Sequence, residues 1–101
     1  MPGNYTIRYL PDAQADLLSI YDWIAHDNPR RACAFVGNLD KRVGALETMP
    51  HLGRIPRYPK LKELGYRVLI LDSYLIFYIV GARTIEVRRV IHASRHLDDL
   101  F

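Results

Sequence analysis

The fold is decided by the C-terminal third of the chain, above all by residues 66–80, YRVLILDSYLIFYIV. This stretch holds two apolar runs, Tyr66–Leu71 and Tyr74–Val80, with only Asp72 and Ser73 between them. Two apolar runs joined by two residues are typical of a β-hairpin. A third apolar run covers residues 84–91 after another short connection. We therefore expect a three-stranded antiparallel meander.

The N-terminal half predicts a short strand and two helices. Residues 5–9 alternate between apolar and polar positions, as a strand does. Apolar residues then recur at spacings of three and four, first from Pro11 to about His26 and again from Pro29 to near Met49. Asn28 suits the capping position before the second helix. Two amphipathic helices joined by so short a turn must fold back as an antiparallel hairpin.

The order β-α-α-β-β-β predicts an α+β fold, a two-layer sandwich in which the helical hairpin covers one face of a sheet of about four strands. Residues 51–64 are rich in glycine and proline and predict an irregular loop. Consecutive apolar residues in the meander predict that both sheet faces are partly buried. A free monomer would then expose apolar surface, which usually marks a protein interface. We expect a final helical turn over residues 97–101.

The composition indicates one small globular domain over residues 1–101. Half of the residues are apolar and 25% are charged, which is enough for a modest core. No apolar run approaches the roughly 20 residues that span a bilayer, and residues 1–4 lack a signal-peptide pattern. We therefore expect a cytoplasmic protein without a membrane partner. The single cysteine, Cys33, cannot form an internal disulfide, and neither a metal nor a cofactor is expected.

Positive charge is concentrated in two places, and the net charge of +3 permits a polyanionic or acidic partner. Residues 54–67 carry five cations against a single acid, Glu63; the cations are Arg54, Arg57, Lys60, Lys62 and Arg67. The last strand ends in residues 89–95, RVIHASR, where a histidine and two arginines follow the meander to the surface. Histidine exchanges protons near neutral pH and arginine suits phosphate. This cluster predicts a polyanionic partner, which the protein binds or cuts.

Taken together, these motifs resemble the RelE/ParE superfamily of small bacterial toxins from toxin–antitoxin operons. The resemblance covers nearly the whole chain and rests on PDAQADLLSIYDWI (11–24), GYRVLILDSYLIFYIV (65–80) and RVIHASRHL (89–97). It implies a toxin that a cognate acidic antitoxin holds inactive, wrapping it with a helix and an added strand. The basic surface and the two-sided apolar meander suit such a partner.

The superfamily implies two different targets. RelE-like members cleave mRNA in the ribosome, whereas ParE-like members poison DNA gyrase and are not known as nucleases. RelE-like cleavage uses lysines before the second strand of the family, an arginine on that strand and an acid–base group near the C-terminus. The resemblance therefore assigns catalysis to Arg67 and His92, and nucleic-acid binding to Lys60, Lys62, Arg89 and Arg95. On this basis we favour ribosome-dependent mRNA cleavage, with gyrase poisoning or an inactive antitoxin-binding relative as alternatives.

The candidate site residues also have structural interpretations. His92 could form hydrogen bonds at a strand end, and Arg67 could pair with Glu63 or Glu86. Lys60 and Lys62 could be solvated loop charges, and Arg95 could anchor the last helical turn.

Two further side chains have alternative interpretations. Arg89 alternates in phase with Val87 and Ile91, so it should face a partner or form a buried ion pair. Trp23 falls outside the apolar stripe of the first helix. It is therefore either a half-exposed packing residue or a contact with the antitoxin or the target.

Overall fold

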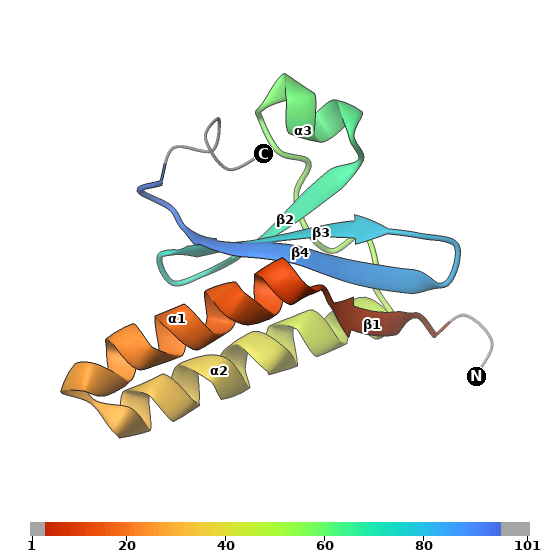
Figure 1. The fold of residues 1–101 in the computed structure, drawn as a ribbon. Helices are drawn as coiled ribbons and strands as arrows, with labels where there is room; N and C mark the ends of the chain where they lie inside the picture. Colours follow the sequence, from red (N-terminus) through yellow and green to blue (C-terminus); the bar gives the residue numbers. More distant parts are fainter. Residues whose placement is uncertain (1–3, 96–101) are drawn as a thin grey trace.

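The computed structural model describes residues 4–95 and has the predicted two-layer α+β architecture. The elements are β1 (Thr6–Tyr9), α1 (Pro11–Asp27), α2 (Pro29–Gly44), the 3₁₀ helix η1 (Ala45–Glu47), α3 (Pro59–Glu63), β2 (Tyr66–Leu71), β3 (Tyr74–Val80) and β4 (Thr84–His92). Figure 1 shows α1 and α2 side by side beneath one face of the sheet, with α3 on the opposite side. The helical turn predicted over residues 97–101 lies outside the described residues.

The four strands form one sheet in the order β1-β4-β3-β2. Strands β2, β3 and β4 pair antiparallel, as their short connections predicted. β1 runs parallel to β4, from Thr6 opposite Thr84 to Tyr9 opposite Val87. Within residues 4–95, therefore, the outer edge of β4 has a neighbouring strand only along its first half.

The helical hairpin turns through one residue, Asn28. Pro11 and Pro29 begin the two helices, where the N–H that proline lacks would have no helical partner. The Asn28 side chain accepts a hydrogen bond from the backbone N–H of Arg31 at 3.1 Å and so caps α2. The α-helical part of α2 ends at Gly44, before its predicted end, and the chain tightens into η1, a common ending for a helix.

Apolar side chains are buried on both faces of the sheet, as predicted. The main core joins the helices to the sheet; among its most buried members are Ala13, Leu39, Val43, Leu46, Ile76, Tyr78, Ile85 and Val87. On the opposite face Leu61 packs with Tyr66, Phe77 and Ile91. The loop predicted for residues 51–64 is therefore partly wrong, since Pro59 starts the short helix α3, which buries Leu61.

Candidate functional site

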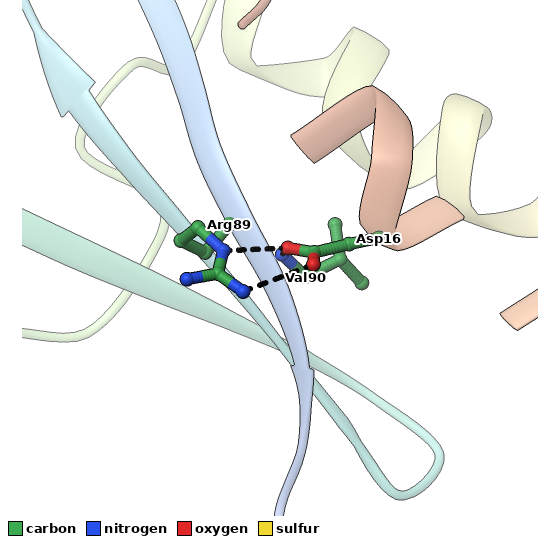
Figure 2. Close-up of polar contacts among 3 residues, drawn as sticks. All are labelled: Asp16, Arg89 and Val90. Carbon is green, nitrogen blue, oxygen red and sulfur yellow. Dashed lines mark hydrogen bonds and ion pairs between the residues drawn. The ribbon is translucent and has the colours of Figure 1, made fainter. Parts of the chain in front are cut away.

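The junction between α1 and β4 is built on the carboxylate of Asp16. Figure 2 shows Asp16 facing both the guanidinium of Arg89 and the backbone of Val90. Arg89 donates from Nε at 2.8 Å and from Nη2 at 3.0 Å, and the Val90 N–H donates at 2.9 Å. The pKa of Arg89 is raised because the hydrogen bond to Asp16 favours its charged form. The ion-pair interpretation of Arg89 is confirmed, and its nucleic-acid role stays a prediction.

A β-bulge in β4 sets the direction of Arg89. The pairing with β3 shifts between Phe77 and Tyr78, so that Phe77 lies opposite Arg89 and Tyr78 opposite Val87. Arg88 is the extra residue of the bulge. Its guanidinium forms an ion pair with the Glu86 carboxylate at 2.8 Å. The expectation that Arg89 stays in phase with Val87 was wrong, because the bulge breaks the strand alternation between them. Arg89 and Ile91 remain in phase, opposite Phe77 and Leu75.

A cleft of about 470 Å³ opens beside this junction, between α1 and the end of β4. Three of the six candidate site residues line it: Arg89, His92 and Arg95. Trp23 and Tyr74 contribute aromatic walls. The cleft thus combines cations, a histidine and aromatic rings, a set that can bind an anionic or mixed polar and apolar partner.

His92 is exposed at the rim of this cleft, where its ring is held on two sides. Its Nδ1 accepts a hydrogen bond from the Ser94 backbone N–H at 3.1 Å and lies 2.7 Å from Ser94 Oγ. Its ring also packs edge-on against Tyr74, with centroids 5.1 Å apart. Because a backbone N–H can only donate, the neutral ring carries its proton on Nε2. The hydrogen-bonding interpretation of His92 is confirmed, and its catalytic role stays a prediction.

A second hollow of about 330 Å³ adjoins the first. Trp23, Tyr74 and His92 line both hollows, and the Trp23 side chain is 77% exposed. The second hollow continues toward Phe35 and Arg31 on α2. We name the two hollows together the α1–β4 groove. Trp23 is more exposed than the half-exposed packing residue that the sequence suggested.

Arg67 lies away from this groove, at the start of β2. Its Nη1 donates to the carbonyl oxygens of Gly53 at 2.9 Å and His51 at 3.3 Å. The buried Tyr78 hydroxyl supports the same loop by donating to Pro50 O and accepting from the Gly53 N–H, both at 2.9 Å. No ion pair of Arg67 with a carboxylate occurs within residues 4–95. Arg67 and Tyr78 therefore hold one loop in place.

The register separates Arg67 from His92. Arg67 lies opposite Tyr78 on β3, whereas His92 lies opposite Tyr74 on the other side of β3. Four residues along a strand span about 13 Å, and two strand spacings add about 10 Å sideways. The two residues predicted to share catalysis are therefore not brought together around one phosphate-sized site.

Lys60 and Lys62 lie on α3 and are exposed. Neither lines either hollow of the α1–β4 groove. The six candidate residues thus fall into two groups, one at the groove (Arg89, His92 and Arg95) and one at the loop and α3 (Lys60, Lys62 and Arg67).

Sequence reasoning missed Asp16 as a structural centre. Asp16 lies between Ala13 and Ile20 at spacings of three and four, so it flanks the buried stripe of α1. A carboxylate beside an apolar stripe indicates a buried ion pair, and that was the available signal. The role of Gly53 had no local signal, because its partners are distant in the chain.

The described part of the chain offers no metal site. Among residues 4–95, no group of three or more His, Cys, Asp or Glu side chains could hold a metal ion. No helix in that range is long and apolar enough to cross a membrane.

Comparison with known proteins identifies both family and fold. The family described as the ParE toxin of type II toxin–antitoxin systems, parDE, matches residues 7–97. The chromosomal ParDE system from P. aeruginosa has a similar chain at 23% identity and a TM-score of 0.75, covering 91% of this chain and 99% of that one. A chain of the RelBE2 toxin–antitoxin complex from Mycobacterium tuberculosis is also similar, at 23% identity and a TM-score of 0.61, covering 88% of this chain and 98% of that one. A search of curated proteins found no significant match.

Proposed function

The chain belongs to the ParE toxin family of type II toxin–antitoxin systems, and we propose that it inhibits bacterial growth when free of its antitoxin. The observation that carries this proposal is the family match over residues 7–97. The complete β-α-α-β-β-β framework, which resembles chains of two solved toxin–antitoxin systems along nearly their whole length, supports it.

We propose that the cognate antitoxin covers the α1–β4 groove with a helix and an added strand. The outer edge of β4 has no neighbouring strand beyond Val87 within residues 4–95, so it can accept one. The adjoining groove exposes the large side chain of Trp23 and the cations Arg31 and Arg95. These features suit an apolar and acidic segment.

For the target, we propose DNA gyrase, which the toxin would poison without cleaving a nucleic acid. Cleavage of RNA needs a base, an acid and a cation around one phosphate. The separation of Arg67 from His92 weighs against such a site. The bonds of Arg67 to two loop carbonyls point the same way, since they engage Nη1 and hold the guanidinium against the loop.

Ribosome-dependent mRNA cleavage is the second candidate. The groove gathers His92, Ser94 and Arg95 beside aromatic rings on which a base could stack. In this case His92 is the acid–base group, Arg89 and Arg95 contact RNA, and Lys60 and Lys62 hold a more distant part of the backbone. Arg67 would then stabilise phosphate charge through Nε and Nη2, while its Nη1 bonds to the loop carbonyls.

The test is induced expression in a bacterium without antitoxin, with pulse-labelling of DNA and protein synthesis over the first minutes. We expect DNA synthesis to fall first and the His92→Ala variant to stay toxic. An early fall in protein synthesis that His92→Ala abolishes would favour the nuclease. Normal growth and unchanged labelling would indicate an inactive relative that binds only its antitoxin.

A further inference from the structure

The segment that joins η1 to β2 exposes apolar and cationic side chains together. Leu52, Ile55 and Tyr58 are 47%, 54% and 42% exposed, and they alternate with the exposed Arg54 and Arg57. We name these five residues the loop surface. Large apolar side chains exposed together in a soluble protein usually mark a contact with another macromolecule.

This exposure is a property of the fold, because hydrogen bonds attach the loop to β2 and to the side chains of Arg67 and Tyr78. Arg54 exchanges two backbone hydrogen bonds with Val68 of β2, at 2.8 and 2.9 Å. The Tyr78 hydroxyl and the Arg67 guanidinium fix Gly53 and its neighbours. A Cβ on Gly53 would lie only 2.7 Å from Tyr78 Oη, so the loop fits tightly against this support. A surface fixed in advance loses less conformational entropy on binding.

The loop also determines how a partner can bind here. Arg54 occupies the outer edge of β2 at Val68, and the Arg42 guanidinium donates to the Ile70 carbonyl at 2.9 Å on the same strand. These contacts take up β2 backbone groups that an added strand would need. A partner must therefore meet the loop surface through side chains, as one folded surface meets another.

We propose that the loop surface docks an acidic, partly apolar surface of the toxin's folded target protein, separately from the antitoxin groove. The proposal rests on the toxin function proposed above. Arg54 and Arg57 complement carboxylates, and Leu52 and Ile55 need apolar partner atoms. A nucleic acid would use the cations and Tyr58 but would gain little from the two aliphatic side chains.

The experiment uses the full chain and separates apolar from charged contributions. One variant, Leu52→Ser with Ile55→Ser, removes apolar surface and keeps every charge. A second, Arg54→Gln with Arg57→Gln, removes two cations. The matched control, Leu18→Ser with Arg83→Gln, changes an exposed leucine on α1 and an exposed arginine at the β3–β4 turn. Growth inhibition at matched expression, affinity for the cognate antitoxin and thermal unfolding are measured for all three.

We expect both loop variants to inhibit growth at least about tenfold less than the unaltered chain, as loss of central interface contacts does. Antitoxin affinity and thermal unfolding should stay unchanged, and the control should remain fully toxic. A toxic Leu52→Ser, Ile55→Ser variant would overturn the proposal, and loss of toxicity only with the arginine variant would indicate a nucleic acid. Loss of antitoxin affinity would make the antitoxin the occupant and overturn it too. If the unaltered chain is harmless, the toxin function fails, and the docking proposal fails with it.

Discussion

The carboxylate of Asp16 satisfies a backbone N–H of β4 at the point where β1 has ended. It receives the Val90 N–H and two bonds from Arg89, while its side chain is only 17% exposed. Such a group is costly to remove, because its partners then lose their hydrogen bonds in a partly buried place. One residue thus joins the first helix to the last strand.

Replacing Asp16 with alanine should destabilise the protein by about 2–3 kcal/mol, since it leaves a partly buried cation and a backbone N–H without this acceptor. Urea unfolding followed by circular dichroism measures the change. Asp22→Ala, an exposed substitution on the same helix, is the control and should stay within about 0.5 kcal/mol of the unaltered chain. Equal stability of the two variants would contradict the structural role of Asp16.

Tyr78 and Tyr9 should make stability sensitive to alkaline pH. The pKa of Tyr78 is raised above its ordinary 10.0 because burial disfavours the phenolate. The pKa of Tyr9 is raised by burial and by its hydrogen bond to the Asp40 carboxylate. Above pH 10 the unfolded chain therefore releases protons that the folded chain retains. The stabilisation is complete below pH 10 and decreases as pH rises above it.

We expect the free energy of unfolding to fall more steeply between pH 10 and 11 in the unaltered protein than in a Tyr9→Phe, Tyr78→Phe variant. Urea titrations at pH 9, 10 and 11 compare the two slopes. The variant should also be less stable at pH 9, because Gly53 N–H and Pro50 O lose the hydroxyl that serves both. Parallel slopes would show that neither tyrosine contributes to the alkaline loss.

At the scale of elements, the segment between η1 and β2 departs most from what the sequence indicated. Glycine and proline correctly marked it as a break between regular elements. Their presence did not indicate that Arg54 would pair with Val68, or that the chain would form α3 and cover the second sheet face. A turn residue reports local backbone freedom, whereas this loop is shaped by β2 and β3.

Two glycine substitutions separate local from tertiary effects. Gly53→Ala should destabilise the fold by about 2–3 kcal/mol, because its Cβ would lie 2.7 Å from Tyr78 Oη and 2.9 Å from Val68 O. Gly37→Ala lies inside α2, where the added Cβ would meet no atom within 4 Å beyond the adjacent residues and the helix's own backbone, and it should stabilise by about 0.5–1 kcal/mol. Thermal unfolding of both variants tests whether Gly53→Ala lowers the stability while Gly37→Ala raises it. A neutral Gly53→Ala would mean that the loop can shift without losing its supports.

β4 shows a second limit at this scale. The apolar run predicted the strand correctly and gave its end within one residue. It could not reveal the bulge at Arg88, because a bulge arises from pairing with β3 and leaves the composition of the run unchanged. Because of this bulge, the Arg89 side chain does not share the face of Val87 that the regular alternation predicted.

At the scale of the whole molecule, two separate surfaces expose side chains suited to a partner. The α1–β4 groove carries Trp23, His92 and Arg95, and the loop surface lies by the outer edge of β2, the sheet edge opposite β1. Figure 1 shows α1 and α3 on opposite sides of the sheet. Two surfaces allow the antitoxin and the target to be recognised by different groups.

Trp23→Ala should weaken antitoxin binding by at least about tenfold, since a central exposed tryptophan commonly dominates an interface. Its effect on stability should be within about 0.5 kcal/mol, because the side chain is 77% exposed. Calorimetric titration measures the affinity, and Leu18→Ala, 64% exposed outside the groove, is the control. Trp23 is the only tryptophan, so its emission should shift to the blue when the antitoxin covers it. Unaltered affinity would remove the groove as the antitoxin site.

The sequence by itself determined the type and order of the main elements, the helical hairpin, the meander and the resemblance to the toxin superfamily. The elements follow from periodicity, turn residues and caps, which act over a few neighbouring positions. The resemblance rests on the motifs at residues 11–24, 65–80 and 89–97. The tertiary structure alone decided that Asp16 forms an ion pair with Arg89, 73 positions away. It also decided that Arg67 donates to the Gly53 carbonyl of a loop and that Arg67 lies far from His92. Such contacts depend on strand order, register and bulges, which only the packed chain specifies.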